Sequence, residues 1–222
     1  HQLIERDRGN VGTTFRFRHA LTRDAILGEL LPHELAALAT RALEVVHALR
    51  PGMPGEWCAT AIRLAETAGL NERAAELLME LASREVATGA LATAEDLLEQ
   101  AGRQAETAPL RVRVDVDAAL LDVLAQVGNA DRAALVAERL LLRLDQLGAE
   151  DQRRAAVHLS VARAFVAASR WEDANQHLDK AREQVTPTPS RLLASIEALA
   201  AEVAIGQQRL SEARDRARAA LD

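Results

Sequence analysis

Apolar and polar residues follow one another along this chain with the period of an α-helix, most clearly from Ser169 to Ala181. After a short polar break, Trp171 is followed at helical spacing by Ala174, Leu178 and Ala181, which places these side chains on one stripe. The same spacing recurs at Leu91/Ala94/Leu98/Ala101, Ala130/Ala133/Ala137/Leu140 and Leu210/Ala213/Ala217/Ala220. The second residues of the stripes serve as repeat anchors and lie 39, 41 and 39 residues apart: Ala94, Ala133, Ala174 and Ala213. A fixed period in this range indicates a stacked array of helices.

The helical period and its interruptions by glycine, proline and serine predict ten helices. Their expected ranges are 32–49, 56–68, 71–88, 91–105, 109–127, 130–147, 151–168, 171–185, 190–206 and 209–221. Loops of a few residues make successive helices antiparallel neighbours. The predicted fold is therefore all-α, with helical hairpins stacked as a superhelix.

Counting back from each anchor defines the other half of the repeat. Thirteen residues upstream the side chains are mostly large: Leu81, Leu120, Val161 and Ala200. Twelve residues upstream they are mostly small: Ala82, Leu121, Ala162 and Ala201. Nine residues upstream they are again mostly large: Glu85, Leu124, Phe165 and Ala204. This order is similar to the tetratricopeptide pattern, in which small residues allow the two helices of a pair to approach closely. Glu85 and Leu121 depart from it, and the period exceeds the 34 residues of the standard repeat.

Composition supports burial through many small contacts. Hydrophobic residues make up 49% of the 222 residues but aromatic residues only 2%. The net charge of −6 disfavours a nucleic-acid surface, which needs a concentrated basic face. The single cysteine excludes an intrachain disulfide, and no apolar run approaches the length of a membrane span. Without a signal-peptide pattern, the expected location is the cytoplasm.

The first 50 residues differ in character from the rest. Leu3 and Ile4 are apolar, residues 7–10 have turn chemistry, and residues 14–17 alternate like a strand, which fits a hairpin whose upstream partner is missing. Residues 50–55 (RPGMPG) then break the chain, so we expect one domain at 1–50 and the helical repeats at 51–222. We expect the chain to be a segment of a larger protein.

The segment FRFRHALTRDAILGELLP, residues 15–32, carries a more specific signal. It resembles the phrase that closes the winged-helix part of bacterial STAND-type signal-transduction ATPases, including the large ATP-binding LuxR-family transcriptional regulators. The matching residues are Phe17, Arg18, His19, Ala20, Leu21, Arg23, Ala25, Leu30, Leu31 and Pro32. The resemblance implies that residues 1–50 end a winged-helix domain, that ATP binds a domain upstream, and that DNA is bound only outside this segment. His19 by itself favours packing at a strand-to-helix corner, because no second metal ligand is near it in sequence.

Superhelices of this type bind partners along the concave face, which the first helix of each pair lines. The tetratricopeptide resemblance places these candidates on it: Glu76, Met79, Ser83, Asp115, Ala118, Asp122, Leu159, Arg163, Ser195, Ala198 and Glu202. The row is mostly acidic with one arginine, which favours a cationic or polar ligand or a basic peptide. The alternative is a solvated charged face.

Catalytic and metal-binding patterns are missing from the sequence. It contains no phosphate-binding GxxxxGK[ST], no HExxH and no paired cysteines, and adjacent acids such as Glu95 and Asp96 point apart on a helix. Cys58 is expected to be a buried structural thiol. We therefore expect no enzyme activity, no catalytic or metal site and no cofactor in this segment.

Three functions remain open. The first is the effector- or partner-sensing region of a LuxR-like STAND regulator. The second is a tetratricopeptide scaffold that holds a peptide in its concave groove. The third is the sensor region of a cyclase or kinase. Taken together, they imply a protein, a peptide or a small-molecule effector on the concave face and no membrane contact, and the scaffold takes a peptide without a small-molecule inducer.

Overall fold

The computed structural model describes residues 4–9, 12–185 and 190–220 and divides the chain into two compact units, His1–Leu70 and Asn71–Asp222. The sequence placed a boundary at residues 50/51. In the structure α3 (Glu56–Thr67), beyond that point, packs against α2 (Pro32–Leu49) within the first unit. The break at residues 50–55 is thus a turn between two packed helices. The assignment of residues 1–50 to a winged-helix domain stays a prediction.

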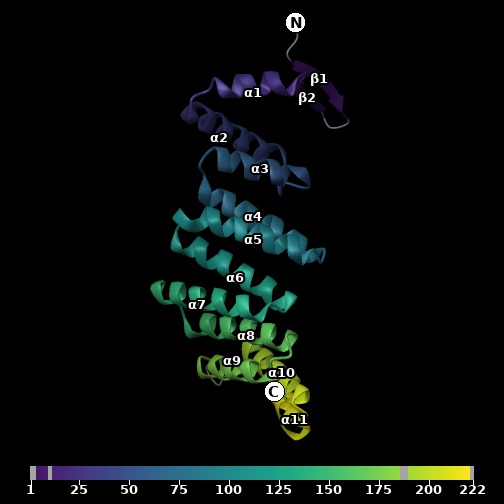
Figure 1. Ribbon diagram of the computed structural model, residues 1–222, viewed down its shortest axis with the longest axis vertical. Coiled ribbons are helices and arrows are strands. Elements are labelled where there is room, and N and C mark those ends of the chain that lie inside the picture. Colours follow the sequence, from purple (N-terminus) through teal and green to yellow (C-terminus); the bar gives the residue numbers. More distant parts are fainter. Residues whose placement is uncertain (1–3, 10–11, 186–189, 221–222) are drawn as a thin grey trace. The chain divides into compact units, whose positions relative to one another are not determined.

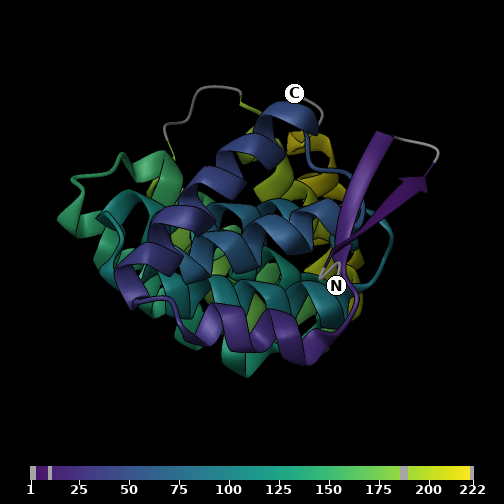
Figure 2. The same ribbon diagram turned by 90° about the horizontal axis from the view of Figure 1, so that it is seen from above.

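The first unit begins with an antiparallel hairpin of β1 (Ile4–Gly9) and β2 (Gly12–Phe17), which can be followed in Figure 2. The hairpin was predicted, but its turn was placed too early. Residues 7–9 belong to β1, where Asp7 is paired with Thr14 across the ladder, and Asn10 lies outside the described residues. Cross-strand pairing outweighs the turn preference of these residues.

Helix α1 (Ala20–Gly28) follows the hairpin directly. His19 stands at the strand-to-helix corner, as expected, but its side chain is exposed and makes no capping hydrogen bond. No residue of α1 is buried, and Leu21 is 83% exposed. Helix α2 then begins at Pro32, with the Leu31 N–H donating to the Glu34 carboxylate at 2.9 Å.

The second unit consists of eight α-helices and one short 3₁₀ turn among its described residues (Figure 1). They are α4 (Asn71–Ala87), α5 (Leu91–Gln104), η1 (Ala105–Thr107), α6 (Leu110–Val127), α7 (Ala130–Gln146), α8 (Asp151–Ala167), α9 (Trp171–Glu183), α10 (Arg191–Gly206) and α11 (Leu210–Ala219). All ten predicted helices are present, and their ends differ from the prediction by at most two residues. The all-α fold with one short hairpin is confirmed.

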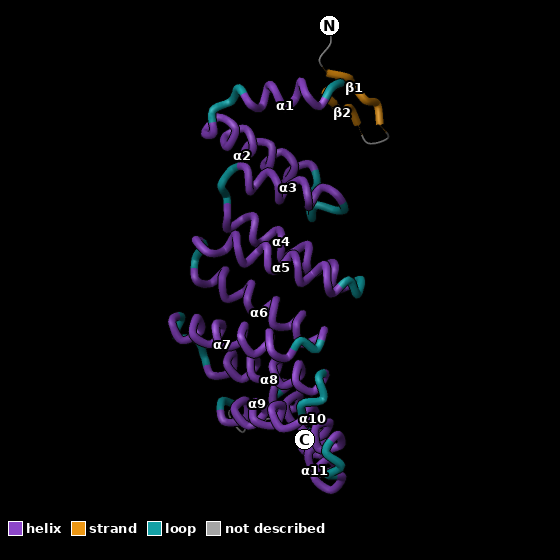
Figure 3. Tube along the Cα trace, in the orientation of Figure 1, coloured by secondary structure: helices purple, strands orange, loops and turns teal. Residues whose placement is uncertain are grey.

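The turns within the helical hairpins are short (Figure 3), and they share one backbone conformation. The residue five positions before each anchor has a left-handed φ: 81° at Gly89, 77° at Gly128, 57° at Ser169 and 61° at Gln208. Ser169 and Gln208 adopt this strained conformation because the N–H of the next residue then caps the C-terminus of the helix. The Arg170 N–H donates to the Phe165 carbonyl at 2.8 Å, and the Arg209 N–H donates to the Ala204 carbonyl at 2.7 Å. The left-handed residue of the last turn is thus Gln208, two residues after Gly206.

The repeat register is confirmed by burial of the anchors. Ala94, Ala133 and Ala174 are 0% exposed and Ala213 is 6% exposed. Small side chains at these positions let the second helix of each pair approach the first. Successive first helices contact one another (α4 with α6, α6 with α8, α8 with α10), and each second helix packs on the next first helix. This arrangement separates an inner face, formed by α4, α6, α8 and α10, from the second helices.

Trp171 is half-buried rather than fully buried, because its ring covers the end of α10. A Cβ added at Gly206 would lie 2.8 Å from two atoms of that ring, closer than real contacts allow. Gly206 therefore makes room for Trp171, which joins the third hairpin to the fourth.

We expect Gly206→Ala to lower the free energy of unfolding by about 1–3 kcal/mol, because the rigid ring must move out of its contact. The measurement is urea unfolding followed by circular dichroism. Gly102→Ala is the matched control in α5, where a Cβ would meet only Val116 Cγ1 at 4.0 Å. That control should gain about 0.5–1 kcal/mol from helix propensity. Equal effects of the two substitutions would contradict the Trp171 contact.

Candidate functional site

Two hollows lie on the inner face of the second unit and include several residues predicted from sequence. Glu76, Met79 and Asp115 line a hollow of about 370 Å³ between α4 and α6, together with Arg111. We call it the α4/α6 hollow. Its lining comes only from first helices, so it belongs to the inner face.

A second hollow of about 160 Å³ lies between α6 and α8, and we call it the α6/α8 hollow. Ala118 and Asp122, both predicted, line it with Arg153, Ala156 and Ser160. Buried leucines of α6 and α7 form its floor: Leu121, Leu140 and Leu144. The hollow thus has an apolar base with polar groups at its edge, which is the usual composition of a binding pocket.

Other predicted residues are not brought into these hollows. Leu159 is 4% exposed and belongs to the core, so it is unavailable to a ligand, and its place in the predicted row is wrong. It was misplaced because α8 is packed on several sides and its inner stripe is narrower than the repeat pattern implies. Ser83, Arg163, Ala198 and Glu202 are exposed but lie outside both hollows, and the Ser195 hydroxyl donates to the Arg191 carbonyl at 2.8 Å.

The acids of the inner face have arginine partners that the row expected from the sequence did not include. Arg73 donates to Glu76 at 2.9 Å, and Asp115 lies 3.9 Å from both Arg111 and Arg153. These arginines occupy flanking helix positions that the predicted row left out, and their long side chains reach the acids. Each of these acids is therefore paired, but the α4/α6 hollow, whose lining also includes Glu80, holds three acids and one arginine, whereas the α6/α8 hollow holds one acid and one arginine. The expected preference for a basic or polar ligand stays a prediction.

Asp122 and Ser160 form the polar contact of the α6/α8 hollow. The Ser160 hydroxyl donates to the Asp122 carboxylate at 2.9 Å across the gap between the two helices. Ser160 is 9% exposed. A carboxylate held in this way keeps free acceptor positions, so it can take a hydrogen bond from the backbone or side chain of a bound segment.

One repeat position that carries buried polar groups was not predicted from the sequence. Sixteen residues before the anchors stand Leu78, Asp117, His158 and Glu197. Three of the four are polar and nearly inaccessible, with exposures of 2%, 7% and 6% for Asp117, His158 and Glu197. The signal was present in the sequence, because a polar residue recurs at one place in an otherwise apolar stripe.

Each buried polar group has its own partners. Arg139 donates to the Asp117 carboxylate at 3.1 Å from Nε and 2.7 Å from Nη2, and Arg143 donates to it at 2.5 Å. The hydrogen bonds to Asp117 raise the pKa of Arg139, against the opposing effect of burial. This pairing fastens α7 to α6.

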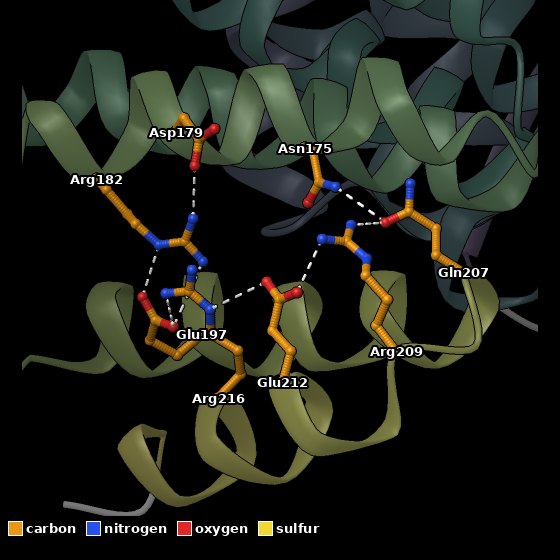
Figure 4. Close-up of polar contacts among 8 residues, drawn as sticks. All are labelled: Asn175, Asp179, Arg182, Glu197, Gln207, Arg209, Glu212 and Arg216. Atoms are coloured by element: carbon orange, nitrogen blue, oxygen red, sulfur yellow. Dashed lines mark hydrogen bonds and ion pairs between the residues drawn. The ribbon is translucent and has the colours of Figure 1, made fainter.

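Glu197 ties three helices together, as Figure 4 shows. It accepts hydrogen bonds from Arg182 of α9 at 2.7 Å and from Arg216 of α11 at 3.1 Å. Burial alone would raise the pKa of Glu197, but the hydrogen bonds and charges of the two arginines outweigh it and lower the pKa. Arg182 also donates to Asp179 of its own helix at 2.8 Å.

His158 faces His177 of α9, with their Nδ1 atoms 3.2 Å apart, so one ring donates and the other accepts. Burial, together with His177 and Lys180, lowers the pKa of His158 to about 4. The pKa of His177 is lowered by burial and by Lys180, while Asp173 acts in the opposite direction. Both rings are therefore neutral at pH 7.

Two further observations concern possible ligands and membranes. Among the residues that the structure describes, no three His, Cys, Asp or Glu side chains lie close enough to hold a metal ion. Within the same residues, none of the helices combines the length and apolar character that spanning a membrane requires.

The chain is similar to solved structures of other helical-repeat proteins. One is BtubC (BKLC) from P. vanneervenii, at 15% identity and a TM-score of 0.58, covering 86% of this chain and 90% of that one. Another is a putative kinesin light chain with nearly identical TPR-like repeats from Podosopora anserina, at 17% identity and a TM-score of 0.55, covering 86% and 94%. No known family model matches the sequence, and neither does any curated protein. The shared feature is the fold, a TPR-like repeat solenoid, and these findings add nothing for the STAND or LuxR resemblance.

We expect the second unit to lose stability as the pH falls from about 6.5 to about 4. In that window the unfolded chain protonates its histidines while folded His158 stays neutral, so the unfolded state binds more protons. The loss from His158 is on the order of 2–3 kcal/mol. In a Trp57→Phe background, urea unfolding can be followed by Trp171, which lies in the second unit.

His158→Gln should flatten this pH dependence, because the buried group no longer titrates. His33→Gln is the control, since His33 is exposed in the first unit and should leave the pH dependence unchanged. A His158→Gln variant that keeps the full acid loss would assign that loss to other groups.

Proposed function

We propose that this chain is a protein-interaction scaffold that holds an extended segment of a partner against the inner face of its second unit. The observation that carries the proposal is the pair of hollows along α4, α6 and α8, each with apolar side chains in its lining and with its acids held by arginines or by a hydroxyl. Successive hollows along a repeat array fit successive side chains of an extended peptide. The partner segment therefore has small apolar side chains, with polar or basic groups opposite the acids of the α4/α6 hollow.

The lining favours this function over catalysis. The polar groups of the two hollows hold one another in ion pairs and hydrogen bonds, and the lining hydroxyl that donates to a carboxylate, Ser160 to Asp122, is only 9% exposed. The buried thiol of Cys58 fits a cytoplasmic setting, which we propose as the site of action.

The test is selection of peptides from a random library on the immobilised 222-residue chain, followed by affinity measurements on variants. Ala156 is exposed at the edge of the α6/α8 hollow, so Ala156→Arg should block it and weaken the selected peptides at least tenfold. The matched control, Gln176→Arg, adds the same charge at an exposed position of α9 outside both hollows. Peptides that lose affinity equally for both variants, or for neither, would rule out this groove.

A second candidate is the sensor region of a LuxR-like STAND regulator. It rests on the phrase at residues 15–32, which spans β2, α1 and the proline that starts α2. In this case the inner face would take an effector or partner and relay it to an ATPase. Determining the gene sequence on both sides tests it: a phosphate-binding loop upstream and a helix-turn-helix downstream are expected. A cyclase or kinase domain in their place would favour the third function, a sensor for a catalytic output.

A further inference from the structure

A third hollow lies away from the inner face, between α5, α6 and α7. It has a volume of about 430 Å³, the largest of the three hollows described here and within the range of small-molecule sites. Its base is apolar, formed by Leu98, Val116, Leu120 and Val136. We call it the outer hollow.

The other repeats provide an internal comparison for this space. Gly102 lines the outer hollow and stands eight residues after its anchor. The same position holds Leu141 in α7 and Arg182 in α9. Leu141 packs against the core, and Arg182 crosses to Glu197 at 2.7 Å (Figure 4). A long side chain thus occupies this position in the second and third hairpins, and the first hairpin has none.

Neither the backbone conformation nor the neighbouring side chains require a glycine at position 102. Gly102 lies inside α5 without a positive φ, where glycine costs about 1 kcal/mol relative to alanine. A Cβ would meet only Val116 Cγ1, at 4.0 Å, an ordinary contact. A glycine that the backbone and its neighbours do not require is typical of places where a ligand approaches the backbone closely.

The polar lining contains one more arginine than it contains acids. Four arginines and three acids line the outer hollow: Arg103, Arg132, Arg139, Arg143, Glu99, Glu106 and Asp117. Asp117 is saturated by Arg139 and Arg143, and Arg132 pairs with Glu99 and also with Glu95 outside the lining. Arg103 is exposed and has no hydrogen-bond or ion-pair partner among the described residues, and the same holds for Glu106 at the edge of the hollow. An unpaired guanidinium beside an apolar base suits a ligand with both an anionic and an apolar part.

We propose that the outer hollow is a binding site for a small organic anion with an apolar body. The apolar part lies against Gly102 and Val116, and the anionic group is bound by Arg103. This site is separate from the inner face, so it can be occupied while a partner segment is bound there. It does not depend on the function proposed above.

The test uses anilinonaphthalene sulfonate, a fluorescent anion with an apolar body, titrated into the folded 222-residue chain. We expect saturable binding that Arg103→Gln weakens about three- to tenfold and Gly102→Leu abolishes, since leucine fills the space. Octanoate should displace the probe, whereas octylammonium, with the same apolar chain and opposite charge, should not. Circular dichroism and thermal unfolding establish that each variant is folded.

Two matched controls separate the site from general effects. Arg163→Gln removes another exposed arginine without a partner among the described residues, and Gly28→Leu adds the same side chain where nothing lies within 4 Å. Both should bind the probe like the original chain. The proposal is overturned if the folded Gly102→Leu variant still binds, if Arg103→Gln and Arg163→Gln behave alike, or if octylammonium competes as well as octanoate.

Discussion

The close approach of two helices through buried alanines is the contact on which the second unit depends. Ala94, Ala133 and Ala174 are fully inaccessible, and a larger side chain at any of them would force the axes of a pair apart. Close pairs leave the larger leucines and valines to fill the space between successive pairs, so a chain almost without aromatic residues still builds a continuous core. The left-handed turn residue five positions before each anchor sets where the second helix begins. The pairing of the helices, the conformation of the turn and the filling of the core thus all follow from the same repeated sequence pattern.

The buried polar groups sixteen residues before the anchors make the packing of each helix pair specific, whereas contacts between alanines alone would be the same in every pair. Alanine stripes at helical spacing can slide past one another at little cost, because their surfaces are alike. Asp117 and Glu197 oppose such slippage, since any other register would bury a carboxylate without its arginine. The partners differ between pairs, with arginines for α6/α7 and a histidine for α8/α9. Each helix is therefore matched to its own neighbour.

Sequence reasoning predicted most of the fold because repeats make the same information available several times. The helix ends, the anchors and the order of the hairpins follow from local spacing, which no long-range contact overrides. The site was less predictable. Burial of Leu159 depends on how far α8 is enclosed by its neighbours, and the neutralisation of Glu76 and Asp115 depends on arginines whose reach the spacing does not show. The clash that keeps Gly206 a glycine arises only where Trp171 meets α10. The differences between the predicted and the observed site thus come from side chains that reach from one helix to another.

In a repeat array each hairpin contacts only its neighbours, so one repeat can change its surface without disturbing the others. The position eight residues after the anchor illustrates this freedom. Leu141 there extends the core, and Arg182 completes the charge of Glu197. Gly102 does neither, and Asp117 takes both of its arginines from α7 instead. Because that carboxylate is satisfied without help from α5, the first hairpin can leave the space open. A single register position therefore decides, repeat by repeat, between packing, ion pairing and an accessible hollow.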